Sequence, residues 1–211
     1  MADYSELHEA ILTGNAAKAQ EVTQLAIDDN VDPSELLSNY MVPAMDEVGR
    51  RFECNEYFVP ELLIAARAMK ASLELLTPKM AEAGTKKAGR IVVGTVKGDL
   101  HDIGKNLVVA MLEGGGFEVI DLGVDVPVER FVEEAQKQAG TVIAMSALLT
   151  TTMSMMKTVI EAIEAAGIRN DTKIMVGGAP ITDQFANEIG ADGYSDNASG
   201  AVTLARKLVA N

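Results

Sequence analysis

The stretch that decides the fold runs from Gly94 to Asn106 and reads GTVKGDLHDIGKN, directly behind the apolar run Ile91-Val92-Val93. A short β-branched run, then glycines, then an apolar-periodic segment predicts a strand, a loop and a helix. Asp99 and His101 then lie on the loop at the carboxyl end of the strand, where open α/β sheets bind ligands. A carboxylate two residues before an imidazole can hold one ring nitrogen and leave the other for a metal. The loop therefore carries a candidate metal ligand.

Taken alone, this pattern has a plain alternative. His101 would then be a solvent-exposed or helix-terminal histidine, and Asp99 or Asp102 would be an ordinary helix cap. Gly98 and Gly104 would be turn residues. An isolated Asp-x-His-x-x-Gly does not separate the two interpretations, so the rest of the chain has to decide.

From Ile91 onward, strand and helix patterns alternate. Five such units predict a parallel, doubly wound, flavodoxin-like α/β sheet of five strands. In that fold, the loops after the first, third and fourth strands meet at one edge of the sheet. The expected strands are 91–96, 117–122, 141–146, 173–176 and 193–195, and the expected helices are 104–113, 127–138, 151–166, 182–189 and 198–209.

The residues before this region show helix patterns and almost no strand patterns. Helix starts are expected at Ser5, Asn15, Asp32-Pro33 and Pro60, and an apolar stripe follows the third start as far as Phe52. Four helices joined by short turns predict a small all-α four-helix bundle. The polar, glycine-containing segment 85–90 predicts a linker, so the expected domains are 1–84 and 91–211.

Composition limits the classes of function. The 211-residue chain has no run of eighteen apolar residues and no basic-then-apolar leader, which predicts a cytoplasmic protein without a membrane partner. Its net charge of -13 argues against nucleic acid as a partner. The single cysteine, Cys54, excludes an intramolecular disulfide and a multi-cysteine metal site. His8 is the only other histidine, so His101 is the main candidate for a metal ligand.

Three segments occur in a recognisable order. Asp99-x-His101-x-x-Gly104 is followed by Ser146-Ala147-Leu148 and then by Gly177-Gly178, each at the start of an expected loop. This order and spacing resemble the cobalamin-binding signature of methionine synthase and the B12-dependent mutases. Residues 37–70 also resemble the helical cap that precedes the cobalamin domain of methionine synthase. In size and layout the chain is most similar to the small corrinoid proteins of anaerobic methyltransferase systems for methanol, methylamines and methylated quaternary amines.

The resemblance implies cobalamin, or a related corrinoid, bound base-off and His-on. His101 would be the lower axial ligand of cobalt, and Asp99 would hydrogen-bond its other ring nitrogen. Thr152 would end a relay of imidazole, carboxylate and hydroxyl, where methionine synthase has a serine. Ser146 and Thr150 would line the slot that takes the displaced dimethylbenzimidazole base.

Further cofactor contacts follow from the same resemblance. Gly177 and Gly178 would leave room for the nucleotide tail. In the cap, Phe52 and Val59 would cover the upper face of the corrin, although a helically spaced aromatic such as Phe52 is also typical of ordinary bundle core. The remaining expected cofactor contacts are Asp102, Ile103, Gly104 and Leu148.

The function that the resemblance implies is methyl carriage in one-carbon metabolism. Co(I) would take a methyl group from a substrate held by a partner methyltransferase, and the methyl-Co(III) form, methylcobalamin, would pass it to a second methyltransferase. The acceptor would be tetrahydrofolate or coenzyme M, and a reductive activase would be a further partner. The chain would not be catalytic alone, because nothing in it resembles a substrate pocket with its own acid-base set. The methyl donor stays open among methanol, methylamines, glycine betaine and aromatic methyl ethers.

Three alternatives remain. The first is the cobalamin subunit of a carbon-skeleton mutase, which shares Asp-x-His-x-x-Gly but covers its cofactor with a barrel rather than a helical cap. The second is a cobalamin-dependent sensor or transcription regulator, which would add a DNA-binding domain and a basic face. The third is a cofactor-free receiver-like module, which leaves Ser146 and the double glycine unexplained.

Overall fold

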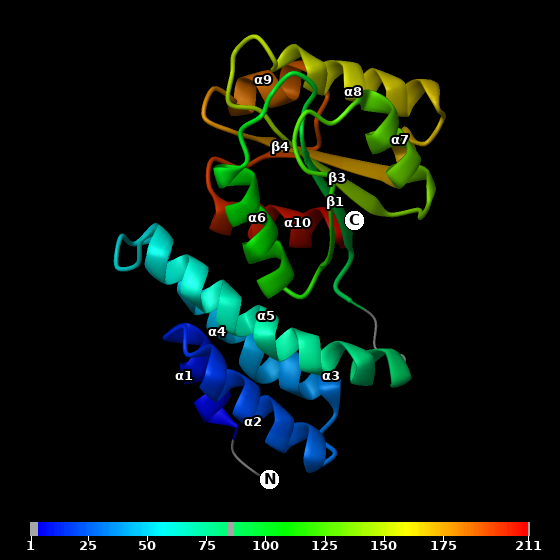
Figure 1. Ribbon diagram of the computed structural model, residues 1–211. Coiled ribbons are helices and arrows are strands. Elements are labelled where there is room, and N and C mark those ends of the chain that lie inside the picture. Colours follow the sequence, from blue (N-terminus) through cyan, green and yellow to red (C-terminus); the bar gives the residue numbers. More distant parts are fainter. Residues whose placement is uncertain (1–3, 84–86, 211) are drawn as a thin grey trace. The chain divides into compact units, whose positions relative to one another are not determined.

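The chain forms two compact units, shown in the computed structural model of Figure 1, which describes residues 4–83 and 87–210. One unit holds the described residues up to Lys87 together with Glu113–Gly116, and the other begins at Ala88 and holds the rest. Residues 85 and 86 of the expected linker lie outside the described residues. The domain boundaries at 84 and 91 stay a prediction.

The first unit is helical, as the sequence predicts. The side chains of Asn15 and Asp32 cap the second and third helices by accepting hydrogen bonds from the amides of Lys18 and Ser34. Its elements are α1 (Ser5–Leu12), α2 (Ala16–Asp28), α3 (Pro33–Leu36), a π-helical turn (Leu37–Met41), α4 (Val42–Glu53) and α5 (Val59–Glu82).

The apolar stripe after Asp32 predicts one continuous helix as far as Phe52, and helical backbone does run without a gap from Pro33 to Glu53. What the stripe does not indicate is the π-helical turn between α3 and α4. Pro43, at the start of α4, has no N–H to donate to the preceding turn, so regular α-helical bonding cannot run through this point. The apolar stripe still faces the core of the helical unit, because Met41, Met45 and Val48 are all buried.

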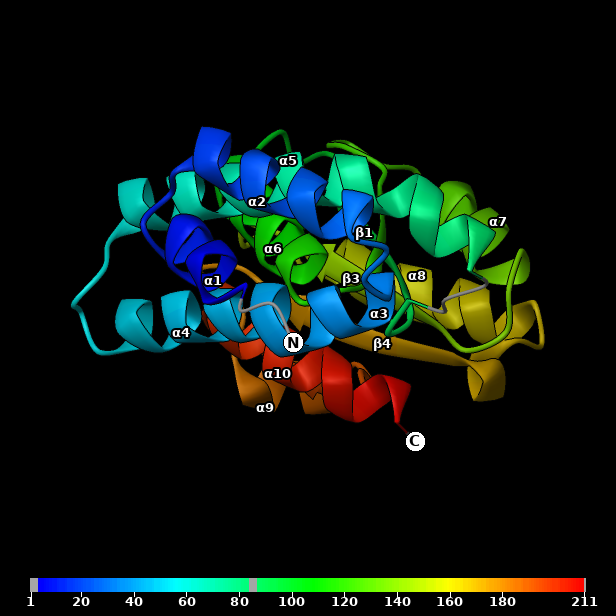
Figure 2. The same ribbon diagram turned by 90° about the horizontal axis from the view of Figure 1, so that it is seen from below.

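Apolar packing holds the helical unit together. Helix α2 lies along α5, and α1 packs against α2 and α4 (Figure 2). Burial of each large apolar side chain contributes about 1.5–3 kcal/mol. The largest fully buried side chains of this unit are Leu7, Ile11, Leu36, Met41, Met45, Leu62, Met69 and Leu76.

The second unit is an all-parallel sheet of five strands in the order β2-β1-β3-β4-β5, which confirms the expected flavodoxin-like fold. The direction of winding reverses between β1 and β3, the topological switch point. The strands are β1 (Arg90–Thr95), β2 (Glu118–Asp121), β3 (Thr141–Ser146), β4 (Thr172–Gly177) and β5 (Gly193–Tyr194). The helices are α6 (Ile103–Gly114), α7 (Val128–Gln136), α8 (Ser154–Ala165), α9 (Asp183–Glu188) and α10 (Ala198–Val209).

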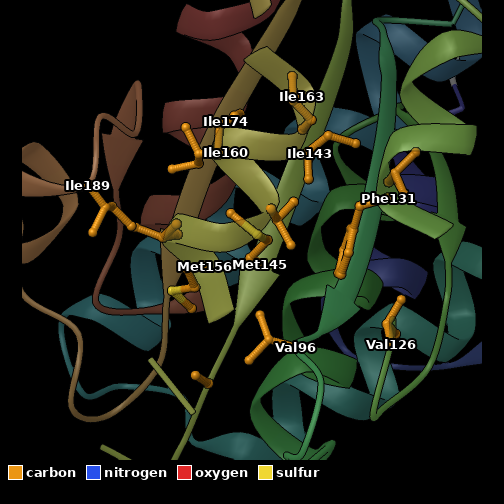
Figure 3. Packing of buried hydrophobic residues seen from close by; sticks show 14 of the residues in the cluster. Val96, Val126, Phe131, Ile143, Met145, Met156, Ile160, Ile163, Ile174 and Ile189 are labelled. Carbon is orange, nitrogen blue, oxygen red and sulfur yellow. The ribbon is translucent and has the colours of Figure 1, made fainter. Parts of the chain in front are cut away.

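Helices cover both faces of this sheet, with α7, α8 and α9 on one face and α6 and α10 on the other (Figure 1). Nearly every residue of β1, β3 and β4 is therefore buried, as continuous apolar strands require. Figure 3 shows the core beneath α7 and α8, where Phe131 and Ile160 pack with Ile143 of β3.

The amino-terminal end of β1 is anchored by a buried ion pair. Arg90, assigned above to the linker, is instead the first residue of the strand. Its guanidinium lies 2.7 Å from the Glu134 carboxylate, and both side chains are 7 % exposed. Because a buried charge needs a partner, Arg90 is held in the sheet rather than in solvent.

Candidate functional site

The strand register brings the three sequence segments together at the carboxyl edge of the sheet. Thr95 of β1 pairs with Ser146 of β3, and Ser146 pairs with Gly177 of β4. The loops that follow these three strands carry His101, Leu148 and Gly178. Residues separated by up to about eighty positions in the chain therefore meet at one edge, next to the switch point.

Asp99 is the buried centre of this edge, with no solvent-exposed surface. One carboxylate oxygen, Oδ2, accepts hydrogen bonds from the Leu148 amide at 2.8 Å, the Leu149 amide at 3.2 Å and the Thr152 hydroxyl at 2.9 Å. All three donors follow β3, whereas Asp99 follows β1. A single carboxylate thus ties the two switch-point loops together.

The ionised form of Asp99 is strongly favoured. Burial by itself raises the pKa of the carboxyl group. The hydrogen bonds from the Leu148 amide, the His101 ring and amide, and the Thr152 hydroxyl outweigh burial and hold the pKa well below its usual range. Asp99 is therefore a carboxylate that only accepts hydrogen bonds.

His101 is held by the other oxygen of Asp99 and faces solvent. Its Nδ1 lies 2.7 Å from Asp99 Oδ1, its own amide donates to the same oxygen at 3.1 Å, and its side chain is 50 % exposed. Its carbonyl accepts from the Thr95 hydroxyl at 2.9 Å. Because the carboxylate only accepts, Nδ1 carries the proton of the neutral ring, and Nε2 presents its lone pair away from Asp99.

Four large apolar side chains are exposed on the two loops that Asp99 joins. Leu100 is 72 % and Ile103 is 77 % exposed on the loop and first helical residue after β1. Leu148 and Leu149, on the loop after β3, are 43 % and 41 % exposed. A single exposed apolar residue is ordinary, but four on the two loops joined by Asp99 form an exposed apolar set, called the apolar rim below.

The remaining expected residues after β1 and β3 differ in their surroundings. Within the described residues, nothing hydrogen-bonds the hydroxyl of Ser146, which is half-buried at the end of β3. Thr150 is exposed. Asp102 opens α6, with its carbonyl accepting from the Asn106 amide at 2.7 Å and its carboxylate from the Asn106 side chain at 3.2 Å. The helix-cap interpretation therefore suits Asp102 but not Asp99.

Gly177 and Gly178 are required by the chain's own backbone. A Cβ on Gly178 would lie 2.0 Å from the Ala147 carbonyl oxygen, and the φ of Gly178 is +126°. A Cβ on Gly177 would lie 2.9 Å from the Ser195 carbonyl oxygen. At Gly104, by contrast, an added Cβ would meet no atom within 4 Å in the described part of the chain.

The two expected residues of the helical unit lie near the turn between α4 and α5. Phe52 is half-buried near the end of α4, so it is not fully enclosed core. Val59 is 37 % exposed at the first position of α5. Its neighbours Phe58 and Leu63 are 60 % and 45 % exposed, so this corner of the unit presents more apolar surface than Phe52 and Val59 alone.

Two family models match the chain. The B12 binding domain matches residues 89–203, and a second B12 binding domain model matches residues 4–77. The chain belongs to the family of B12-binding corrinoid proteins. It is 41% identical to a corrinoid protein from Desulfitobacterium hafniense (strain Y51) over 97% of this chain and 96% of the relative. It is 47% identical to dimethylamine corrinoid protein 2 of Methanosarcina mazei over 85% and 84% of the two chains.

A solved structure extends the likeness. The chain matches the methanol:cobalamin methyltransferase complex MtaBC from Methanosarcina barkeri with a TM-score of 0.87 and 30% identity, covering 99% of this chain and 80% of that chain. The corrinoid proteins of this family serve methylamine and methanol methyltransferase systems. The expected fold and family are thus confirmed.

The site residues suit a corrinoid. A flat, largely apolar macrocycle with a central metal suits an accessible imidazole and exposed apolar surface, and His101 and the apolar rim provide these. A Cβ on Gly104 would meet no atom within 4 Å, and no residue of the described chain hydrogen-bonds the Ser146 hydroxyl. Among residues 4–83 and 87–210, no group of three or more His, Cys, Asp or Glu side chains is arranged so that it could hold a metal ion.

Some contributors carry no signal in the sequence. The Leu149 amide that binds Asp99 acts through its backbone, so no residue type marks it. Leu100 could have been recognised as an apolar residue inside a polar loop. Phe58 and Leu63 fit the apolar periodicity of a helix, and only their exposure in the structure distinguishes them from core.

Proposed function

We propose that this corrinoid protein carries a methyl group between two methyltransferases, with cobalamin or a related corrinoid bound His-on by His101. The observation that carries the proposal is the fixed imidazole: Nδ1 is hydrogen-bonded to a buried carboxylate, and the ring belongs to a side chain that is 50 % exposed. When bound, cobalamin supplies a cobalt centre that can accept and release a methyl group.

The chain's own groups would control the axial position. Asp99 keeps the Nδ1 proton in place, so Nε2 is the nitrogen that meets the metal. When cobalamin is bound, the Asp99 carboxylate would keep the ring oriented toward it. Thr152 donates to the same carboxylate, which links His101 through Asp99 to the turn that precedes α8.

Several cofactor contacts belong to this proposal. Ser146 and Thr150 would bind the displaced base, and Gly177-Gly178 would lie beside the nucleotide tail. Four further residues would contact the cofactor near the imidazole: Asp102, Ile103, Gly104 and Leu148. In the helical unit, Phe52 and Val59 would cover the upper face of the corrin. No helix in the described residues is long and apolar enough to cross a membrane, and no membrane partner is proposed.

The partners would be two methyltransferases. One relative of this chain is named a dimethylamine corrinoid protein, and one similar structure is a methanol:cobalamin methyltransferase complex. We therefore propose a substrate-specific methyltransferase as the donor enzyme. A second methyltransferase would pass the methyl group to tetrahydrofolate or coenzyme M, and a reductive activase would restore the reduced cofactor. The chain alone would show no methyltransferase turnover.

The test is an ultraviolet-visible spectrum of the purified protein loaded with hydroxocobalamin and freed of excess. Variant His101→Ala should lose the His-dependent spectrum or retain less cobalamin, whereas His8→Ala, the matched control in α1, should behave as the wild type. Unchanged spectra and retention in His101→Ala would refute the axial-ligand claim. Addition of a methyl donor with candidate partner enzymes after reduction then separates a carrier from a sensor, because only a carrier becomes methylated in a partner-dependent way.

A further inference from the structure

The loop after β2 runs beside the loop that carries His101. The Leu122 amide donates to Val93 at 2.8 Å, the Thr95 amide donates to Gly123 at 3.0 Å, and the Val126 amide donates to Thr95 at 3.0 Å. These bonds continue the pairing with β1 past the end of β2 at Asp121. The loop after β2 therefore lies alongside the end of β1, from which the His101 loop begins.

Asp125, on the loop after β2, hydrogen-bonds two successive residues of the His101 loop. Its carboxylate oxygen Oδ1 accepts from the Gly98 amide at 2.8 Å, and its own amide donates to the Asp99 carbonyl at 2.9 Å. Asp125 has a φ of +52°, a left-handed conformation that few residues other than glycine adopt. Gly98 is also left-handed, with a φ of +85°. Two left-handed residues, Asp125 and Gly98, are thus hydrogen-bonded to each other, and Gly98 directly precedes Asp99 in the chain.

The carboxylate of Asp125 is ionised at neutral pH. The Gly98 amide, followed by the Lys97 ammonium, lowers its pKa, and slight burial opposes them. The Lys97 Nζ lies 3.0 Å from the carboxylate, but both side chains are about half exposed, and such a surface pair contributes little. The hydrogen bond to Gly98 is therefore the contact that matters.

We propose that Asp125 is a positioning residue for the corrinoid site: its carboxylate fixes the Gly98 amide, and with it the peptide from which Asp99 reaches the His101 ring. The inference rests on the proposed function, because it concerns the imidazole that binds the cofactor. Nothing in the Asp-x-His-x-x-Gly pattern indicates it, since Asp125 lies on another loop and its carboxylate binds Gly98 and Lys97, which precede that pattern.

The expected effect is smaller than that of losing a direct partner of the imidazole. Removal of a direct partner of a metal-ligating histidine typically costs 10- to 100-fold in affinity. Asp125 acts one residue further away, and Asp99 keeps its bonds to Leu148 and Thr152. We expect the loss of the Asp125 carboxylate to speed cobalamin dissociation by about 3- to 10-fold.

Three variants separate the acceptor oxygen from the backbone and the charge. Asp125→Gly keeps the left-handed backbone without strain but removes the carboxylate. Asp125→Asn keeps both the backbone preference and an acceptor oxygen for Gly98, and it removes the charge. Lys97→Met removes the surface ion pair alone. Only Asp125→Gly should speed dissociation and reduce the His-on spectrum, and the other two should stay within about twofold of the wild type.

Either of two results would overturn the inference. Wild-type dissociation and spectrum in Asp125→Gly would mean that the carboxylate does not position the site. An equal defect in Asp125→Asn would mean that charge, not the acceptor oxygen, is what counts. A thermal melt of each variant accompanies the measurement, and a defect that persists in Asp125→Gly with an unchanged melting temperature supports positioning.

Amide hydrogen exchange of the cofactor-free protein separates this inference from the proposed function. The Gly98 amide should be protected in the wild type and in Asp125→Asn and should lose protection in Asp125→Gly. An unprotected Gly98 amide in the wild type would refute the positioning contact whatever the cofactor does. If His101→Ala leaves the cobalamin spectrum unchanged while the Gly98 pattern holds, the proposed function fails and the contact stands.

Discussion

The loop after β1 and the loop after β4 reach the same edge of the sheet, but different forces shape them. Side-chain hydrogen bonds shape the first, because Asp99 binds donors on two loops and leaves Nε2 of His101 facing solvent. Backbone sterics shape the second, because Gly178 lies against the Ala147 carbonyl and admits no Cβ.

This difference shows that a glycine in a binding signature has two possible causes. Gly178 is required by the fold itself, with or without a ligand. Gly104 has open space around it, so the fold tolerates a side chain there, and under the proposed function only the ligand would require glycine. The following predictions test this contrast, from the largest expected effect to the smallest.

Gly178→Ala should destabilise the α/β unit most, by about 3–5 kcal/mol, because the new Cβ would overlap the Ala147 oxygen and the backbone is left-handed. Urea unfolding of the cofactor-free protein measures this loss. Gly177→Ala is the matched control and should cost less, since its nearest contact is 2.9 Å. Equal losses in the two variants would contradict the steric explanation.

Asp99→Ala should cost about 2–4 kcal/mol, because it leaves the Leu148 and Leu149 amides without their acceptor and removes one of the two acceptors of the Thr152 hydroxyl. Asp99→Asn keeps one acceptor oxygen and should cost less than half as much. Unfolding in urea reports both values. A stable Asp99→Ala variant would show that Asp99 does not join the two loops.

His101→Ala should change the stability by less than about 1 kcal/mol, because the side chain is half exposed and Asp99 keeps its other donors. Its effect should instead fall on cobalamin retention, with a loss of at least about tenfold. Equilibrium dialysis alongside urea unfolding separates the two quantities. A loss of stability without a loss of cobalamin retention would show that His101 stabilises the fold and does not bind the cofactor.

Gly104→Ala should have the smallest effect on the cofactor-free protein, raising its stability by about 0.5–1 kcal/mol, because alanine favours the first turn of α6 and has room there. Cobalamin affinity should fall by a few-fold in the same variant, measured by equilibrium dialysis. If affinity is unchanged, Gly104 is a turn residue and no more.

The sequence predicted most of the fold for clear reasons. Alternating β-branched runs and helical stripes specify a parallel sheet, and the observed strands differ from the expected ones by at most one residue at either end. The π-helical turn before α4 was not predicted, because the apolar stripe continues through it and only the missing N–H of Pro43 marks the change in hydrogen bonding.

Within the candidate site, the sequence by itself determined which chemical groups are present: a lone imidazole, a carboxylate two residues before it, a hydroxyl and paired glycines. Local spacing suffices for this, because Asp99 and His101 are close in the chain. Only the tertiary structure decided what those groups face. Three contacts join separate loops: the hydrogen bonds from Leu148 and Leu149 to Asp99, the hydrogen bond from Gly98 to Asp125, and the close approach of Gly178 to Ala147. The distances between these loops depend on the register of the sheet, and the packing of the whole unit sets that register.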